Sequence, residues 1–417
     1  MFHLRTLSLP TLLLLFVGAP VWWAFPDALP FWRALGIIVG WAGAGLLLFS
    51  LLLMVREVRL ANALGGLERI TAWHHQSGMA AYLLLLLHPL ALAAAGWAES
   101  PALAWQVISP FSENWPVWLG WGGLILLMLG LATTFMSRLA YPTWRRLHGM
   151  LGLGVLIGFI HVLQLGINAG GLLALAAALL ILLWRLLRVD LGTAAKPYIV
   201  TSVKPVAQSM VEVSLKPLAM PIDAVPGQFV LAAFFEGPNY QGCGEFHPFT
   251  ISGIGLEHEI RIGVKALGDC TRHMQRLESG VSARVHGPFG EFLHALPCRP
   301  MLWVAGGIGI TPFMSFLRQR SVRTPTTLVY LYRGEHDAAY LDELTALARH
   351  RPGLVLQAEA TGTGVPDLNR LLPRAEALEN HECYVCGPPG LIYTVSRTLI
   401  DRGIPLERIH FEHFDFR

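Results

Sequence analysis

Six apolar runs fill roughly the first 190 residues, and each is close to the length that crosses a lipid bilayer. A helix needs about 20 mostly apolar residues to span the hydrocarbon core. Only 14% of the chain is charged, against roughly 25% in soluble domains. We therefore predict a bundle of six transmembrane helices at residues 10–25, 34–55, 74–96, 116–137, 148–167 and 170–188.

The first run also has features of a secretion signal, because Arg5 precedes a leucine-rich segment. No small-residue cleavage site precedes Val21, and the six-helix topology needs this span. We therefore interpret residues 10–25 as a transmembrane helix rather than a cleaved leader.

Basic residues gather in alternate loops, which predicts the orientation of the bundle. Short loops rich in Lys and Arg stay in the cytoplasm, and the loops between 96 and 116 and near Asn168 have neither residue. Both termini are therefore predicted to be cytoplasmic, in the inner membrane of a bacterium. The net charge is only +3, and the basic residues of the first half lie in short loops. We therefore expect no nucleic-acid partner. The basic positions are Arg56, Arg59, Arg69, Arg138, Arg145, Arg146, Arg185 and Arg188.

Two of the runs each carry a histidine near the start and another about four helical turns later. These are His74 and His88 in one run and His148 and His161 in the other. Ionisable side chains within a membrane are costly and usually functional. Neutral imidazoles at two depths suit two b-type haems, one near each membrane surface.

His75 is an alternative to His74, and two observations favour His74. The 14-residue step from His74 to His88 keeps both on one helical face, and Gly78 follows His74 just as Gly152 follows His148. A glycine one turn from a ligand leaves room for a flat porphyrin. The 13-residue step from His148 to His161 leaves these two about 140° apart on an ideal helix, so local distortion of this glycine-rich helix is expected.

From Lys196 the pattern changes to six short strands separated by Gly and Pro, which predicts a small antiparallel β-barrel. From Pro300 strands alternate with helical segments, which predicts an α/β nucleotide-binding fold with a parallel sheet. The predicted domains are a transmembrane haem domain at 1–191, a barrel domain at 192–297 and an α/β domain at 298–417.

All five cysteines lie in the second half of the chain. This placement predicts a reducing compartment around that half and argues against a disulfide framework. Cys383 and Cys386 form a CxxC pair. Because the chain has no second CxxC, a structural role is favoured over thiol redox chemistry or half of a metal site.

Two segments of the barrel have the residues of a flavin site. HPFTIS offers an aromatic, Phe249, and a hydroxyl, Thr250, to a flavin ring and its ribityl chain, and Lys265 with the following GDCT turn suits a pyrophosphate. Each segment alone would be an ordinary strand or helix cap. The candidate residues are His247, Pro248, Phe249, Thr250, Ser252, Lys265, Gly268 and Thr271.

Two strand-to-helix turns of the α/β domain suit a dinucleotide. GGIGITP lets the backbone approach a pyrophosphate at a helix N-terminus, and CGPPG supplies a second turn for the nicotinamide end. Arg333 could meet a 2′-phosphate or be a solvated loop residue. A terminal aromatic, Phe416 or its rival Phe414, could stack on the flavin. The nucleotide candidates are Gly306, Gly307, Gly309, Thr311, Pro312, Arg333, Cys386, Gly387 and Pro388.

HPFTIS, GDCT, GGIGITPF and CGPPG, in this order behind paired membrane histidines, resemble the ferric reductase and NADPH oxidase superfamily. The resemblance implies a ferredoxin-NADP reductase module with FAD, and electron flow from NADPH or NADH through FAD and two haems to oxygen or ferric iron outside. It pairs His74 with His148 at the inner haem and His88 with His161 at the outer haem. Cys386 and Phe416 would stand where hydride transfer occurs.

One departure concerns the acceptor. Eukaryotic superoxide-forming members carry a further histidine one turn beyond the outer ligand, where this chain has Leu92. This argues against oxygen as a dedicated acceptor and leaves the acceptor open between oxygen and ferric iron. A haem-bearing subunit that relays electrons to a partner protein is the alternative function. The nucleotide motifs argue against it, so no obligate protein partner is expected.

Overall fold

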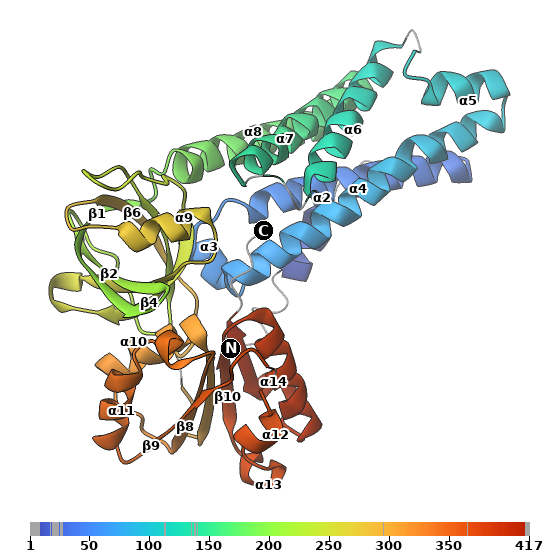
Figure 1. The fold of residues 1–417 in the computed structure, drawn as a ribbon. Coiled ribbons are helices and arrows are strands. Elements are labelled where there is room, and N and C mark those ends of the chain that lie inside the picture. The colour runs from blue at the N-terminus through green and yellow to red at the C-terminus, as the bar shows by residue number, and fades with distance from the viewer. Residues whose placement is uncertain are drawn as a thin grey trace. The chain divides into compact units, whose positions relative to one another are not determined.

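The computed structural model describes residues 9–16, 18, 25, 28–111, 114–134, 136, 139, 141–294, 296–364 and 366–412. The chain divides into two compact units, Met1–Leu191 and Gly192–Arg417. The first unit is helical, and the second contains both sheets (Figure 1). Each unit is described by itself below.

Five helices of the first unit are long and apolar enough to cross a membrane. The predicted run at 10–25 lies partly outside the described residues, so the count of six is not confirmed. Two short helices, α3 (Val58–Ala63) and α5 (Pro101–Ile108), and a π-helical turn, η1 (Leu186–Asp190), were not predicted. The long helices are α2 (Phe31–Leu53), α4 (Leu67–Trp97), α6 (Trp115–Thr134), α7 (Tyr141–Gln164) and α8 (Asn168–Arg185).

The two histidine-bearing helices begin earlier than their apolar runs. α4 begins at Leu67 and α7 at Tyr141, seven residues before the predicted starts, because the first turns are polar and carry no hydropathy signal. α2 lies along α4, and α6 lies along α7 (Figure 1). Where α6 packs against α7, a Cβ atom added to Gly123 would lie 3.2 Å from the carbonyl oxygen of Gly154, and one added to Gly154 would lie 3.2 Å from that of Gly123. Small residues of this kind let membrane helices approach closely.

The barrel predicted from the strand pattern is confirmed. Its six strands pair antiparallel and close in the order β1-β2-β5-β4-β3-β6. Inward-facing apolar side chains, such as Tyr198, Phe234 and Ile262, fill its interior. One short helix, α9 (Asp269–His273), follows β5. The strands are β1 (Lys196–Ala207), β2 (Met210–Pro217), β3 (Phe229–Phe234), β4 (His247–Ile254), β5 (Ile260–Lys265) and β6 (Ser282–Phe289).

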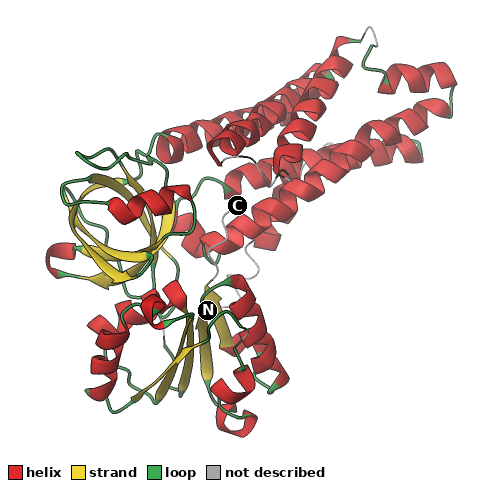
Figure 2. Cartoon of the chain, in the orientation of Figure 1, coloured by secondary structure: helices red, strands yellow, loops and turns green. Residues whose placement is uncertain are grey.

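The predicted parallel sheet is also confirmed, with the strand order β11-β10-β7-β8-β9. Helices lie on both of its faces (Figure 2), and β7 shows why. Trp303 packs into the core on one face, whereas its neighbours Leu302 and Val304 pack into the core on the other. The strands are β7 (Met301–Gly306), β8 (Thr326–Tyr332), β9 (Leu354–Ala360), β10 (Glu382–Cys386) and β11 (Ile409–Glu412). The helices are α10 (Thr311–Gln319), α11 (Leu341–Arg349), α12 (Leu368–Leu371), α13 (Ala375–Leu378) and α14 (Pro389–Asp401).

The expectation that the cysteines form no disulfide is wrong for one pair. Cys243, before β4, and Cys270, in α9, form a disulfide with their Cα atoms 5.8 Å apart. Spacing along the chain does not predict this contact, because the fold of the barrel brings together residues that are 27 positions apart.

The CxxC pair on β10 cannot act as a dithiol. Residues three apart on a strand point to opposite faces, and Cys383 and Cys386 accordingly pack into different cores. Burial, with the charge of Glu382 adding to it, raises the pKa of the Cys383 thiol to about 12. The structural interpretation of this pair therefore holds.

Candidate functional site

The inner histidines, His74 of α4 and His148 of α7, face each other, with ring centres 6.1 Å apart. A metal–imidazole bond is about 2.0 Å long, so two imidazoles on opposite sides of one iron place their ring centres roughly 6 Å apart. His75 is exposed, whereas His74 is half-buried and contacts α2 through Ser50. The separation fits two imidazoles that would together hold one haem.

The outer histidines, His88 of α4 and His161 of α7, line one cavity of about 540 Å³. This volume lies within the roughly 300–1,000 Å³ of cofactor pockets. Two glycines of neighbouring helices leave space for the rings. A Cβ on Gly40 would lie 2.5 Å from Nδ1 of His88, and one on Gly120 would lie 3.2 Å from Cε1 of His161. The 13-residue step on α7 therefore does not keep His161 out of this cavity.

Each of the four histidines has Nδ1 next to an oxygen of a neighbouring helix. Nδ1 of His88 lies 2.8 Å from the carbonyl oxygen of Gly36, and Nδ1 of His161 lies 2.6 Å from that of Pro116. Protonated Nδ1 donates to these carbonyls, and Nε2 then keeps its lone pair for a metal.

The inner pair shows the same arrangement. Nδ1 of His74 lies 2.7 Å from Oγ and 3.1 Å from the carbonyl oxygen of Ser50, and Nδ1 of His148 lies 3.4 Å from Oγ1 of Thr134. Metal-bound histidines usually donate their other N–H in this way. The sequence did not identify these partners. A backbone carbonyl has no residue signature, and the hydroxyls of Ser50 and Thr134 come near the histidines only through the packing of neighbouring helices.

Leu92 lies on the same cavity as His88. A Cβ on Gly36 would lie 2.6 Å from Cδ2 of Leu92. The Leu92 side chain therefore packs against α2 at the position where Gly36 has no side chain. Pro89 lines the cavity directly after His88. Most of the lining is apolar, and Gln106 is one of its few polar residues.

The HPFTIS segment forms β4, but its side chains differ in exposure. His247 and Pro248 are half-buried, whereas Phe249 packs inside the barrel core and Thr250 is buried. Burial lowers the pKa of His247 below its ordinary value, so the imidazole is neutral at pH 7. The hydroxyl of Ser252 is completely buried and donates to Glu212 Oε1 at 2.5 Å. Ser252 therefore serves the protein interior rather than an open site.

The GDCT turn is a closed helix cap. The backbone N–H groups of Leu267 and Gly268 both donate to Oγ1 of Thr271, each at 2.9 Å. Lys265, at the end of β5, points toward the α/β domain, since a Cβ on Gly307 would lie 3.4 Å from its Nζ. The structure therefore brings one predicted flavin residue close to a predicted nucleotide residue.

The two predicted nucleotide turns lie side by side at the ends of the adjacent parallel strands β7 and β10. A Cβ on Gly309 would collide with the carbonyl oxygen of Cys386, and one on Gly387 would lie 3.1 Å from Cα of Gly306. Thr311 begins α10, where its hydroxyl donates to the carbonyl of Ile308 at 2.8 Å. Turns at the carboxyl ends of strands are the usual ligand site of open α/β sheets.

The remaining candidates differ in their positions. Cys386 is 2% exposed at the end of β10, and Pro312 is buried at the start of α10. Arg333 follows β8 and is exposed. Phe416 and Phe414 lie outside the described residues.

Comparison with known families matches both halves of the chain. Residues 39–159 match the ferric reductase like transmembrane component, and residues 303–397 match the oxidoreductase NAD-binding domain. A ferric reductase-like membrane component followed by this nucleotide-binding domain matches the architecture of the ferric reductase and NADPH oxidase superfamily.

Its similarity to curated proteins lies in about half of the chain. The ferredoxin–NAD(P)+ reductase component of naphthalene 1,2-dioxygenase/salicylate 5-hydroxylase systems from Ralstonia sp. is 28% identical over 214 residues, which are 47% of this chain and 62% of that protein. The flavohemoprotein of Vibrio cholerae is 27% identical over 210 residues, 46% of this chain and 52% of that protein. The chain thus spans between half and two thirds of these relatives.

Among solved structures, the chain is similar to the flavohem-like FAD/NAD binding domain of nitric oxide dioxygenase from Vibrio cholerae. The similarity covers 53% of this chain and 99% of that chain, with 21% identity and a TM-score of 0.46.

Proposed function

We propose that this protein transfers electrons from NADPH or NADH, through FAD and two b-type haems, to oxygen or ferric iron on the far side of a membrane. His74 with His148 would hold the inner haem, and His88 with His161 the outer one. The second unit and both termini would lie in the cytoplasm of a bacterium, where the nucleotide is available. The carrying observation is that all four histidines have Nδ1 next to an oxygen of a neighbouring helix.

When bound, FAD accepts a hydride and releases single electrons, and haem iron carries one electron at a time. The protein residues bind and orient these groups. Gly306, Gly309 and Gly387 let the two strand-to-helix turns pack closely against each other, and Lys265 offers a cation beside Gly307. Five of the candidate flavin contacts have accessible surface: His247, Pro248, Lys265, Gly268 and Thr271.

The outer cavity supports reduction of an acceptor near His88 and His161. Its lining is mostly apolar, which excludes water from the proposed haem, and Leu92 occupies the position of a further histidine. No histidine besides these two lines the cavity within the described residues. This arrangement favours ferric iron over a dedicated oxygen site.

The test is reduction of the purified protein under anaerobic conditions. Added NADPH or NADH should shift the haem absorbance to the reduced form, and His88→Ala should remove one haem and abolish acceptor reduction. Subsequent oxygen or a ferric chelate separates the two acceptors, scored by superoxide-dismutase-sensitive dye reduction and by a ferrous chelator. A wild-type protein with bound haem whose absorbance does not change would disprove the proposed electron path.

A further inference from the structure

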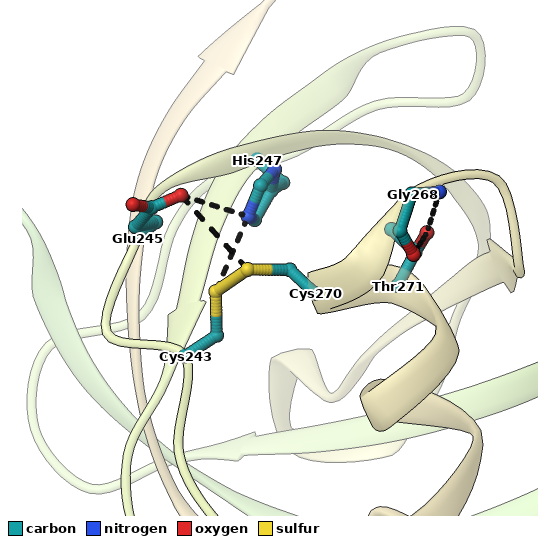
Figure 3. Close-up of a disulfide and its surroundings, with 6 residues drawn as sticks. All are labelled: Cys243, Glu245, His247, Gly268, Cys270 and Thr271. Carbon is teal, nitrogen blue, oxygen red and sulfur yellow. Dashed lines mark hydrogen bonds and ion pairs between the residues drawn. A yellow bond between two sulfur atoms is a disulfide. The ribbon is translucent and has the colours of Figure 1, made fainter. Parts of the chain in front are cut away.

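Four side chains with metal-binding atoms converge where the barrel meets α9. Cys243 and Glu245 lie in the loop before β4, His247 begins β4, and Cys270 lies in α9. Figure 3 shows the sulfurs, the carboxylate and the imidazole pointing toward one another. The side chains of Glu245 and His247 are only 17% and 25% exposed. The cluster is therefore a partly enclosed set of two sulfurs, one nitrogen and one oxygen.

The distances match the edges of a tetrahedron around a zinc ion. Zinc bonds of about 2.3 Å to sulfur and 2.0–2.2 Å to nitrogen or oxygen give tetrahedral edges of roughly 3.4–3.8 Å. Nε2 of His247 lies 3.5 Å from Sγ of Cys243 and 3.8 Å from Oε2 of Glu245, which in turn lies 3.9 Å from Sγ of Cys270. The two sulfurs are closer than an edge because they are bonded to each other, and all four ligand atoms lie within 4.8 Å of one another.

We propose that the dithiol form of this cluster binds one Zn²⁺ through Cys243, Glu245, His247 and Cys270, and that the disulfide and the zinc complex are alternative states of one site. The Cα separation of 5.8 Å already brings the two cysteines to the same side of the site. Two thiolates with one imidazole and one carboxylate form a donor set that suits zinc.

The exchange between the two states is balanced by a dithiol reductant. Two electrons and two protons from the reductant break the sulfur–sulfur bond of Cys243 and Cys270, and the reductant becomes a disulfide. Zinc then displaces the two thiol protons and binds both thiolates. Oxidation by a disulfide reagent reverses these steps and releases the metal. Bound zinc therefore protects the thiols, and the oxidised protein has no zinc site.

Either state connects the loop before β4 to the turn that begins α9. Cys270 is one residue from Thr271, whose hydroxyl accepts from the N–H of Gly268 (Figure 3). The cluster thus fixes this turn to the barrel. This inference goes beyond the proposed electron transfer, and its failure would leave the haem and nucleotide experiments unaffected.

The test measures zinc bound to the full-length protein in detergent. The protein is reduced with a phosphine, freed of metal with a chelator, incubated with zinc chloride and desalted, and zinc is counted by plasma mass spectrometry. One zinc per chain is expected, falling to near zero after oxidation with diamide and in Cys270→Ser. Glu245→Gln should bind zinc at least tenfold more weakly. Cys298→Ser, which removes an exposed cysteine outside the cluster, should bind like the wild type.

A second measurement needs no variant. Zinc should protect Cys243 and Cys270 from N-ethylmaleimide, as read by peptide mass spectrometry, while Cys298 reacts at the same rate with or without zinc. The proposal is overturned if zinc leaves the labelling of Cys243 and Cys270 unchanged. It is also overturned if correctly folded Cys270→Ser retains as much zinc as the wild type, because the bound metal would then be adventitious.

Discussion

Arg318 Nη1 lies 2.7 Å from Glu212 Oε1 and joins α10 of the α/β fold to β2 of the barrel. The same guanidinium donates to the carbonyl oxygen of Ser252 at 3.0 Å and to both carboxylate oxygens of Glu343 at 2.7 Å. Cζ, the central carbon of this guanidinium, lies 5.1 Å from the ring centre of Tyr340. One cation thus connects α10 to three other elements of the second unit, β2, β4 and α11.

Replacing Arg318 with alanine should destabilise this junction. The side chain of Glu212 is 8% exposed, and removal of one partner of a buried ion pair costs about 3–5 kcal/mol. Hydrogen–deuterium exchange of the full-length protein should therefore show faster exchange in peptides from β2 and α10. Arg351→Ala, at a half-buried arginine outside this junction that donates to a backbone carbonyl, is the control. Unchanged exchange in Arg318→Ala would show that the pair contributes little.

We expect the ion pair of Arg318 and Glu212 to make the protein less stable in acid. Burial opposes ionisation of Glu212, but the hydrogen bonds and charge of Arg318 outweigh it, so its pKa lies below the ordinary 4.5. The unfolded carboxyl binds a proton at higher pH than the folded one, so this stabilisation is complete above pH 4.5 and is lost as pH falls through the folded pKa. Glu212→Gln should be less stable at neutral pH and show a shallower decline in acid. Thermal unfolding across this range measures both, and parallel curves would contradict the prediction.

His74 and His75 should differ in haem binding. His74 faces His148, whereas His75 is exposed. We expect His74→Ala to retain about one haem per chain and His75→Ala to retain two, as counted by the pyridine haemochrome method. Loss of haem in His75→Ala with both haems kept in His74→Ala would reverse the assignment.

Gly309 and Gly390 provide a matched pair in the nucleotide site. A Cβ on Gly309 collides with the carbonyl oxygen of Cys386, whereas a Cβ on Gly390 has nothing within 4 Å. Overpacking costs about 1–3 kcal/mol, which corresponds to roughly 5- to 150-fold weaker binding. Gly309→Ala should raise the KM for the nicotinamide nucleotide by this factor, and Gly390→Ala should not. Equal KM values would show that the two turns separate freely.

We expect the protein to prefer NADPH to NADH, because the guanidinium of Arg333 can bind the 2′-phosphate of NADPH. It is exposed directly after β8, and hydrogen bonds to a charged group contribute about 1.5–3 kcal/mol. Arg333→Ala should lower kcat/KM for NADPH by roughly 10- to 150-fold and leave that for NADH unchanged. Arg349→Ala, at the exposed end of α11, is the control. An equal decrease with both nucleotides would rule out a 2′-phosphate contact.

The periodic parts of the fold were predictable from the sequence, and the contacts between distant segments were not. The short alternating strands after Lys196 and the succession of strands and helices after Pro300 predicted both sheets, because burial of one or both sheet faces sets the pattern. The Cys243–Cys270 disulfide depends on the antiparallel pairing of β4 with β5, which brings the start of one strand beside the end of the other. The first turns of α4 and α7 were missed because they carry charged residues, which lower the mean hydropathy. Chemical type selected His74 and Gly309 as candidates, and their roles stay predictions. It also placed Ser252 in the flavin site, although its hydroxyl is buried.

The oxygens beside Nδ1 of His88 and His161 belong to the backbone at Gly36 and Pro116. A carbonyl oxygen is present whatever side chain a residue carries, so no single substitution deletes either acceptor. Substitution of Gly36 or Pro116 therefore leaves a hydrogen-bond acceptor beside each imidazole. The positions of α2 and α6, rather than the side chains at these two residues, set the lengths of the two hydrogen bonds.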